Sequence, residues 1–261
     1  MITLDHILIA TERLSEAKAH CERLGFKVAY GGTERRALNA LIFLKDGTLI
    51  ELIGKDRFPA IVSLLRSMRL TRLFGLMIDR IASFPRVPAG LFNVSLHAAD
   101  LHGTCRRLKE NGIRVSRPTR LSRKRDDGVT VRWELLGTAP YDLPFIIGEY
   151  RPGRLSDASL MEHPNGAIGI DSVTIGCRDL ARYGDIYTRL LEVQPVMATR
   201  NAVRCANFAL TGSTVTLVES QDVPNIFTSA DESFPLAFAI RHRRSDMTIE
   251  NVTIGARDWT A

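Results

Sequence analysis

The sequence predicts an α+β fold built from tandem β-α-β-β-β modules, with a helical insertion between the first two modules. Two observations predict the modules: an apolar strand motif recurs four times, and a helix followed by three short strands comes after three of the copies. Such repetition is typical of folds assembled from copies of one supersecondary unit. A third observation, a long segment with helical spacing after the first module, predicts the insertion.

Four short segments share the strand motif, which begins each module. Counted from the same position they read "HILIATERL", "NVSLHAADL", "SVTIGCRDL" and "NVTIGARDW". The shared first position holds His6, Asn93, Ser172 and Asn251. Apolar and β-branched residues predict a strand in each copy. Three copies then carry an acidic residue near the expected helix start, where a negative charge is favourable.

The elements after the motif also repeat in order. The apolar spacing predicts helices over Leu14–Leu24, Leu101–Asn111 and Leu180–Leu191, the first two ending at Gly25 and Gly112. Short strands follow in "FKVAY", "IRVSR" and "VQPVMA". Each module then closes with a predicted hairpin: Ala37–Leu44 with Thr48–Ile53, Val129–Leu136 with Leu143–Tyr150, and Val203–Leu210 with Thr214–Glu219.

This organisation divides the chain into six parts. They are the first module (1–54), the helical insertion (55–90), the second module (91–151), a linker (152–166), the third module (167–220) and a partial fourth module (221–261). The last part leaves two alternatives open. Pro235–Arg243 and Ile249–Ala256 either form a hairpin that adds to the third module or pair with another chain in a homodimer.

The insertion has an apolar stripe and arginines at three-residue steps on another face. This pattern fits an amphipathic helix that covers the sheet, a lid over a site, a dimer contact or a helix on a membrane surface. Gly75 and Pro85 are expected to break it into pieces.

Composition and charge narrow the function classes. The net charge of +6 permits an anionic substrate or weak attraction to nucleic acid, but no nucleic-acid motif with interleaved aromatic residues is present. No apolar run approaches the roughly 20 residues of a membrane span, and Met1 leads directly into a strand pattern rather than a secretory signal. Four scattered cysteines fit free thiols in a reducing compartment. We therefore expect a cytoplasmic protein with a small-molecule substrate, no nucleic acid and no membrane span.

A tandem β-α-β-β-β chain of this kind resembles the vicinal oxygen chelate superfamily, and more narrowly its glyoxalase-like domain group. The segments that carry the resemblance are "LDHILIA", "LIELIG", "NGIRV", "RKRDDGVTVRWELLG", "LPFIIGEY" and "HPNGAIGIDSVTI", within residues 1–220. The resemblance implies curled mixed sheets around a cleft, formed by pairing the first two modules. It also implies metal ligands on the first and fourth strands of a module. The superfamily includes lyases, isomerases, ring-cleaving dioxygenases and non-catalytic binders.

His6 and Glu51 occupy the two ligand positions of the first module in this frame. Imidazole and carboxylate bind divalent Fe, Mn, Zn, Co or Ni, and open positions can then receive a substrate with adjacent oxygens. In the second module the position of Glu51 falls on Gly148 or Glu149, and a slip of one residue reverses the face. If Glu149 faces inward, it is the third ligand and, with Glu51, a candidate catalytic carboxylate.

Other residues are candidates for substrate binding. Asn93 stands at the position of His6 in the second module, and His97 lies on the same face of that strand. Arg123 could meet an anionic substrate or belong to a solvated loop. Trp133 and Phe145 could line an apolar pocket or pack in the core.

The favoured function is a metal-dependent lyase, isomerase or dioxygenase that acts on an oxygen-rich or anionic molecule. The alternatives are a metal-free protein that binds or sequesters a small molecule, and a dimerising module.

Overall fold

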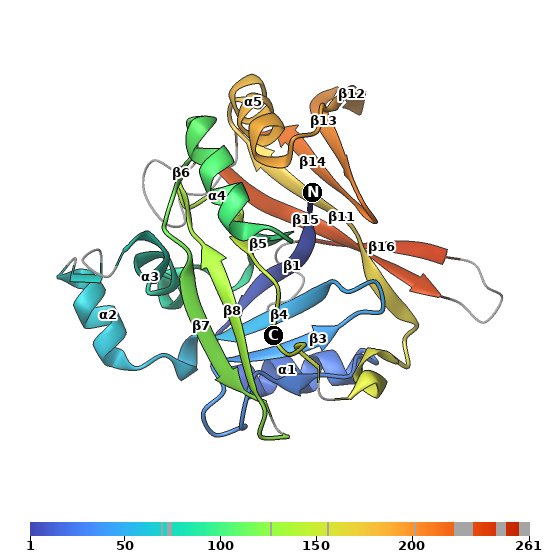
Figure 1. Cartoon of the computed structure of the whole chain (residues 1–261). Helices are drawn as coiled ribbons and strands as arrows, with labels where there is room; N and C mark the ends of the chain where they lie inside the picture. Colours follow the sequence, from blue (N-terminus) through green and yellow to red (C-terminus); the bar gives the residue numbers. More distant parts are fainter. Residues whose placement is uncertain are drawn as a thin grey trace.

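The computed structural model of the chain describes residues 1–68, 70–71, 75–125, 127–155, 157–200, 202–221, 232–243 and 249–255, the last range by its backbone alone. Within these residues the fold consists of an eight-stranded sheet, a six-stranded sheet and a small two-stranded sheet. The two large sheets lie side by side, and the helices pack on them (Figure 1). No helix in the described part of the chain is long and apolar enough to cross a membrane.

The eight-stranded sheet combines strands from the first half of the chain. Its order is β2 (Ala29–Tyr30), β3 (Asn39–Phe43), β4 (Leu49–Gly54), β1 (Ile2–Thr11), β5 (Gly90–Ala98), β10 (Phe145–Ile147), β8 (Thr130–Leu136) and β7 (Thr119–Lys124). β1 pairs with β4 in parallel, and β5 pairs with β10 in the same way. The two halves meet where β1 and β5 run antiparallel. The sheet curls around a cavity that both halves line.

One face of this sheet is covered by helices, because alternate strand residues are apolar and point to that side. Ile7 and Ile9 of β1 join the same core cluster as Leu14 of α1 (Leu14–Arg23) and Leu101 of α4 (Leu101–Glu110). The N-terminal caps of α1 and α4 differ. Asp100 caps α4 by accepting a hydrogen bond from the Gly103 N–H at 2.8 Å, in accord with the acidic residue expected there.

The six-stranded sheet has the order β12 (Val196–Arg200), β13 (Val203–Leu210), β14 (Ser213–Glu219), β11 (Ala167–Cys177), β15 (Ser233–Arg243) and β16 (Ile249–Gly255). α5 (Leu180–Leu191) covers it with a row of buried side chains that includes Tyr183 and Tyr187. β11 and β14 repeat the parallel pairing of β1 and β4. The strand that runs antiparallel to β11, as β5 does to β1, is β15, and β16 pairs with β15 from outside. The fourth copy of the strand motif therefore adds to the third module through a hairpin.

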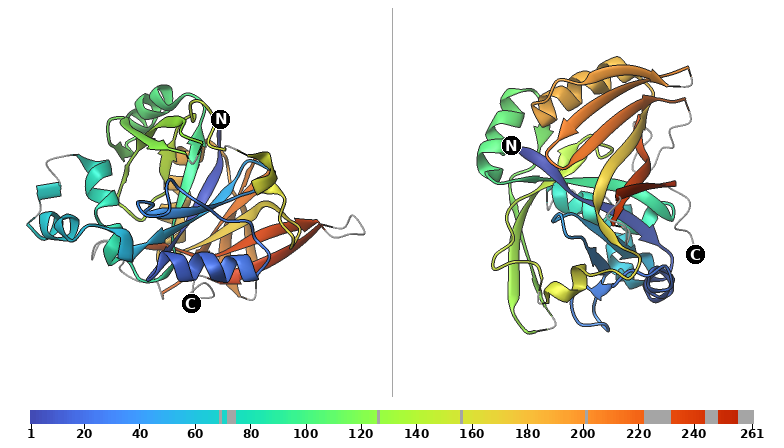
Figure 2. Two further views of the ribbon diagram at one scale, coloured as in Figure 1. Left: turned by 90° about the horizontal axis from the view of Figure 1, so that it is seen from below. Right: turned by 90° about the vertical axis from the view of Figure 1, so that its right-hand side faces the viewer.

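The insertion contains α2 (Ala60–Ser67) and α3 (Leu76–Ile81), flanked by short 3-10 helices at Lys55–Arg57 and Phe84–Arg86. Gly75, with a φ of 95°, immediately precedes α3, so the expected break lies there. The insertion lies on the side of the eight-stranded sheet opposite the six-stranded sheet (Figures 1 and 2).

The strands of the second module differ from the prediction in two ways. The "IRVSR" segment contributes only β6 (Arg114–Val115), which pairs with β9 (Thr138–Ala139) outside the main sheet. A strand that the repeat did not predict, β7, takes the place at the edge and pairs with β8. The cause is the "SRKR" run: its polar residues read as a loop, yet alternate side chains of β7 are half-buried and exposed in the pattern of an edge strand.

Candidate functional site

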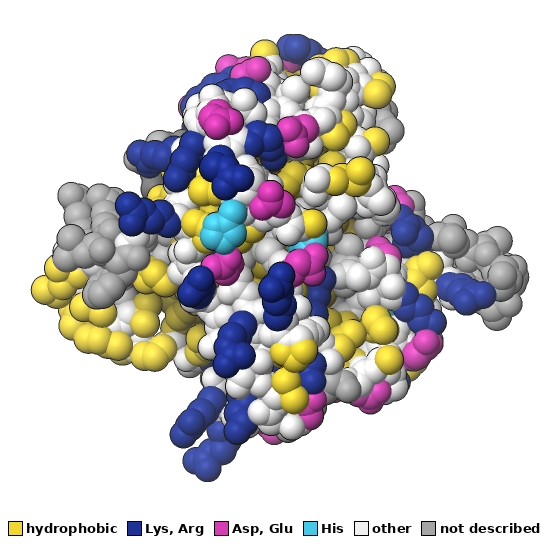
Figure 3. Space-filling model, in the orientation of Figure 1, with side chains coloured by type: hydrophobic (Ala, Val, Ile, Leu, Met, Phe, Trp, Pro, Cys, Tyr) yellow, Lys and Arg dark blue, Asp and Glu magenta, His cyan; other side chains and the backbone are white. Residues whose placement is uncertain are grey.

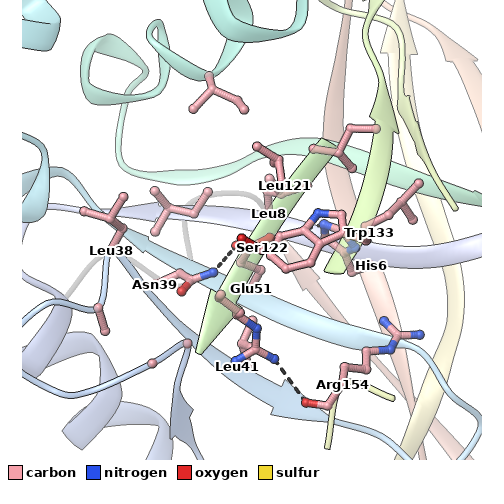
Figure 4. A pocket seen from close by; sticks show the side chains of 18 of the residues that line it. His6, Leu8, Leu38, Asn39, Leu41, Glu51, Leu121, Ser122, Trp133 and Arg154 are labelled. Carbon is pink, nitrogen blue, oxygen red and sulfur yellow. Dashed lines mark hydrogen bonds and ion pairs between the residues drawn. The ribbon is translucent and has the colours of Figure 1, made fainter. Parts of the chain in front are cut away.

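The curled face of the eight-stranded sheet holds a cavity of about 550 Å³ (Figure 4). Strands of both halves line it, and so does the insertion. A cavity of this size accepts a small organic molecule. It is the candidate functional site of the described part of the chain.

His6 lies on the wall of this cavity, near the middle of β1. The pairing of β1 with β5 shifts between Leu4 and His6, so Asp5 is the extra residue of a β-bulge. Bulges redirect side chains, and they occur frequently beside active sites. Here the bulge allows the neighbouring residues Asp5 and His6 to contact each other, although neighbours in a regular strand point to opposite faces.

The imidazole of His6 lies between two carboxylates. Its Nδ1 is 2.5 Å from Asp5 Oδ1, and its Nε2 is 3.2 Å from Glu51 Oε2. Burial alone would lower the pKa of His6, but Asp5 and Glu51 outweigh it and raise that pKa from 6.5 to about 9. His6 is therefore an imidazolium at neutral pH.

Glu51 lies on β4 across from Leu8, with its side chain on the cavity wall. Asn39 of the neighbouring strand donates a hydrogen bond from Nδ2 to Glu51 Oε1. Burial raises the pKa of Glu51, but His6, Asn39 and the charge of Arg123 together lower it below its usual value. Glu51 is therefore an ionised carboxylate, and it faces the cavity.

The polar part of the cavity is rich in positive charge. Besides His6 and Glu51, the charged side chains in its lining are Arg36, Arg123, Lys124 and Arg154. Arg154 donates to Asp5 Oδ1 at 3.0 Å and stacks over the Tyr150 ring at 4.7 Å from its centroid. Arg123 donates to the Arg154 carbonyl at 3.1 Å, the contact drawn beside Arg154 in Figure 4. This balance of charge favours an anionic ligand.

Most of the remaining lining is apolar. The insertion supplies Phe58, Met77, Ile81 and Phe84. They belong to or pack against a core cluster with Leu8, Leu135 and Ile147 from the strands. The insertion therefore helps to line the site, besides covering the sheet, and the cavity offers an apolar region next to charged groups.

Three of the substrate-binding residues predicted from the sequence line the cavity. Arg123 lies on β7 rather than in a loop, Trp133 stacks near Tyr150 with centroids 5.4 Å apart, and Phe145 meets the His6 ring edge to face at 5.6 Å. Asn93 is not in the lining. It is buried opposite Leu8, and its Oδ1 accepts from the Val94 N–H at 2.7 Å.

His97 and Glu149 lie together outside the cavity lining. His97 Nε2 is 3.2 Å from Glu149 Oε1, and the Glu149 side chain is 54 % exposed. A Cβ built on Gly148 would lie 3.3 Å from Leu101 of α4, so Gly148 faces the helix and Glu149 the opposite way. Glu149 nevertheless sits past the end of β10, paired with His97. The expected set of His6, Glu51 and Glu149 is therefore not brought together.

The fit of a divalent metal rests on His6 and Glu51. His6 Nε2 is buried and faces the carboxylate of Glu51 at 3.2 Å. Asp5 on Nδ1 is the kind of partner that orients a metal-binding imidazole. The pair fits two positions around an ion. The described residues contain no group of three or more His, Cys, Asp or Glu side chains placed to hold one.

Sequence reasoning missed Asp5, Asn39, Tyr150 and Arg154 as parts of the site. Asp5 carried a signal, since an acidic residue inside an apolar strand is costly without a partner. Asn39 lies opposite Ile53 and next to Glu51 only through the β3–β4 pairing. Arg154 lies in the segment expected to be a linker, and its contact with Asp5 joins residues far apart in the chain. Such long-range contacts leave no local pattern.

The fold and the site together define a class of proteins: two β-α-β-β-β modules that curl around a small-molecule cavity, with polar residues on the first and fourth strands. Comparison with protein families matches residues 4–191 to the glyoxalase-like domain. The chain belongs to this glyoxalase-like domain family. A search of curated proteins gives no significant match.

Solved structures share the fold at low sequence identity. A hypothetical protein from Staphylococcus aureus superimposes with a TM-score of 0.64 at 14% identity, over 96% of this chain and 98% of its own. A fusion of a xylose isomerase-like TIM barrel with 4-hydroxyphenylpyruvate dioxygenase gives 0.52 at 12% identity, over 93% of this chain and 37% of its own. A mutant of 4-hydroxymandelate synthase from Streptomyces coelicolor gives 0.52 at 12%, over 92% and 71%. At these identities the likeness shows the fold alone.

Proposed function

We propose that the protein is a glyoxalase-like enzyme that binds a small anionic, oxygen-rich molecule with an apolar body and transfers a proton within it, as an isomerase does. One observation carries the proposal: a buried imidazolium, His6, is held between Asp5 and Glu51 on the wall of a cavity. Paired titratable groups with strongly shifted pKa values occur frequently at catalytic sites.

Glu51 is the proposed general base. Its lowered pKa keeps it ionised, and its carboxylate faces the cavity. It would take a proton from a carbon next to a carbonyl group and return it to another atom of the same molecule, so no other reactant is needed. His6 would stabilise the oxygen on which negative charge develops through its Nε2–H, which lies on the cavity wall beside Glu51.

The rest of the cavity supports the proposed substrate class. Arg123 and Arg154 lie beside the acid–base pair and suit a carboxylate or another anionic group. Phe58, Met77 and Phe84 of the insertion suit an apolar body. The ligand we propose is thus an amphipathic anion.

Hydrogen–deuterium exchange tests the proposed proton transfer. The protein would be incubated in D2O with a panel of 2-oxo and 2-hydroxy carboxylates that carry aliphatic or aromatic tails, and exchange at carbon would be followed by proton NMR. We expect exchange with the wild type and a loss of at least about 100-fold in Glu51→Gln, since a positioned general base contributes about that much or more.

Glu149→Gln is the matched control, because Glu149 is a carboxylate next to a histidine but lies outside the cavity lining. Its exchange rate should equal that of the wild type. Binding of a panel member without any exchange would reject proton transfer and favour a metal-free binding or sequestering protein. Equal loss in both variants would reject the assignment of Glu51.

A second candidate function uses a divalent metal, and the 3.2 Å separation of His6 Nε2 and Glu51 Oε2 favours it, since an ion could replace the Nε2 proton between the two groups. His6 and Glu51 would hold the ion, with Asp5 orienting the imidazole. The ion would supply a Lewis acid for adjacent substrate oxygens. Metal uptake from Fe, Mn, Zn, Co or Ni solutions, measured by mass spectrometry of the dialysed protein, should then be lost in His6→Ala and Glu51→Ala and kept in Glu149→Ala. Wild-type protein that takes up none of these metals contradicts this candidate.

We also propose a cytoplasmic location. All four cysteines, Cys21, Cys105, Cys177 and Cys205, are buried free thiols, which is usual in a reducing compartment. Fractionation of cells that express the protein tests this, and recovery in an extracellular or periplasmic fraction would contradict it.

A further inference from the structure

Tyr150 follows β10 and lines the cavity, but the proposed proton transfer does not use it. Its ring packs against the apolar cluster that joins the insertion to the strands. The next residue, Arg151, exchanges two backbone hydrogen bonds of 2.9 Å with Arg132 of β8. These bonds fix the backbone of the segment on β8 and keep Tyr150 in the cavity wall.

Two side chains of the lining contact the ring of Tyr150. The centroid of the Trp133 ring lies 5.4 Å from the Tyr150 centroid, and the Arg154 guanidinium lies 4.7 Å from it. An aromatic neighbour and a cation at these distances both attract the ring of a tyrosine. These contacts orient the ring and do not involve its hydroxyl group.

The hydroxyl group of Tyr150 has no hydrogen-bond partner among the described residues. The charged groups that act on it are Asp5, Arg154, Glu51 and Arg123, which also surround the acid–base pair. Burial and the two carboxylates raise the pKa of Tyr150 well above its usual value, so the hydroxyl keeps its proton at neutral pH. The fold therefore leaves a hydrogen-bond donor unused in the polar part of the cavity.

We propose that Tyr150 selects ligands that carry an uncharged oxygen next to their anionic group, and that its hydroxyl donates a hydrogen bond to that oxygen. The inference rests on the proposed function and specifies its ligand. Arg123 and Arg154 bind the anionic group, and Tyr150 binds the neighbouring oxygen. A buried donor without an acceptor loses the hydrogen bonds that it makes to water, so a ligand that supplies the acceptor is favoured over one that lacks it.

The charge on this side of the molecule suits such a ligand. Lys and Arg side chains gather on the surface over β7 and β8, the strands that carry Arg123 and the anchor of the Tyr150 segment (Figure 3). A positive surface attracts anions but does not distinguish one anion from another. The unused hydroxyl adds a contact that depends on a second, uncharged oxygen.

Isothermal titration calorimetry of the full chain with 2-hydroxyoctanoate and octanoate tests the proposal, because the two probes differ only in the oxygen next to the carboxylate. The wild type should bind 2-hydroxyoctanoate more tightly, and Tyr150→Phe should lower the ratio of the two affinities about fivefold to tenfold. The melting temperature of this variant should stay within about 2 °C of the wild type, because the ring contacts remain and the hydroxyl has no partner in the described part of the fold.

Tyr141→Phe is the matched control. The Tyr141 hydroxyl donates to Asp79 Oδ2 at 2.6 Å, outside the cavity lining. This variant should keep the affinity ratio of the wild type and lower the melting temperature by about 2–4 °C, because it loses a hydrogen bond of the fold.

An unchanged affinity ratio in Tyr150→Phe would overturn the proposal. If both affinities fell together, the hydroxyl would contact the carboxylate instead, and if neither fell, the ring would serve packing alone. A wild type that binds neither probe would contradict the proposed ligand class and this inference with it, whereas binding with an unchanged ratio contradicts this inference only.

Discussion

The two halves of the eight-stranded sheet follow one topology and carry different chemistry. In one half β1 pairs in parallel with β4, and in the other β5 pairs in parallel with β10. The first half brings Asp5, His6 and Glu51 together. Across from His6 the second half has Ser95, and Ser95 in turn lies next to Phe145 of β10. The acid–base residues Asp5, His6 and Glu51 lie in the first half, whereas the second half contributes the aromatic rings of Trp133 and Phe145 together with Arg123 and Lys124.

This difference distinguishes the residues that the fold requires from the residues that form the site. On the helix-covered face the two halves are alike, since Ile7 and Ile9 of β1 and Val94 and Leu96 of β5 belong to one core cluster. On the opposite face His6 of β1 lies across from Ser95 of β5. The fold therefore constrains one face of each strand, and the chemistry of the other face is free to diverge between halves.

The largest expected difference in stability is between substitutions of His6 and Ser95, which face each other across the two strands. His6→Ala leaves the carboxylates of Asp5 and Glu51 buried without the imidazolium, which should lower the free energy of unfolding by about 3–5 kcal/mol. The buried Ser95 Oγ has no hydrogen-bond partner among the described residues, so Ser95→Ala should change it by less than about 1 kcal/mol. Urea denaturation at pH 7 measures both.

His6→Gln checks that the effect comes from charge, since glutamine fills similar space without a positive charge. It should be nearly as destabilising as His6→Ala. Near-equal losses for His6→Ala and Ser95→Ala would show that the two halves do not differ in the way proposed.

The pH dependence of stability is the next largest effect. The pKa of His6 is raised from 6.5 to about 9, so its protonation stabilises the folded state fully below pH 6.5, and this contribution is lost as the pH rises through 9. The shift corresponds to at most about 3 kcal/mol. Urea denaturation of the wild type at pH 6 and pH 10 should show a fall of that order.

The comparison with His6→Gln isolates this contribution from other groups that titrate in the same range. The difference in unfolding free energy between wild type and His6→Gln should shrink from pH 6 to pH 10. A difference that is constant over this range would mean that the pKa of His6 is the same in the folded and unfolded states.

Much of the fold could be predicted from the sequence, because the modules repeat. The α5 helix was predicted with its observed bounds, Leu180–Leu191, and the hairpins of the first and third modules lie within one or two residues of β3, β4, β13 and β14. β7 was missed because an edge strand needs little apolar content. The sequence left open whether the β15 segment forms a hairpin or pairs with another chain, because its pairing with β11 is a long-range contact that no local pattern encodes.

The candidate site was predictable only where one residue stood out locally. His6 and Glu51 interrupt apolar strands, and the structure places their side chains 3.2 Å apart. Glu149 is likewise a charged residue next to an apolar strand. It lies beyond the last residue of β10, however, where its side chain is exposed to solvent and pairs with His97. The cavity residues of the insertion read as ordinary helix, because packing against a distant sheet decides which of its faces is buried.

Phe145 offers a smaller test of the aromatic half. Its ring meets His6 edge to face at 5.6 Å, and the Arg80 guanidinium lies 5.4 Å from its centroid. Phe145→Leu keeps an apolar side chain but removes both ring contacts, so we expect a loss of about 1–2 kcal/mol in unfolding free energy. The pKa of His6 should stay raised in this variant, because Glu51 and Asp5 still contact its imidazole. That result would show that the first half alone sets the charge of His6. A histidine pKa that stays near 9 by NMR fits this expectation, whereas a return toward 6.5 would show that the aromatic wall sets the charge of the site.

The smallest effect is expected at the pair of His97 and Glu149, which resembles the pair of His6 and Glu51 in composition and distance. Both histidines lie 3.2 Å from a glutamate oxygen, but Glu149 is more than half exposed and lies outside the cavity lining. Water screens an exposed ion pair, so Glu149→Gln should lower the free energy of unfolding by less than about 1 kcal/mol. Urea denaturation of Glu149→Gln and Glu51→Gln side by side measures the difference. A larger loss for Glu149→Gln would mean that burial does not distinguish the two pairs, and that the outer pair also serves the fold or the site.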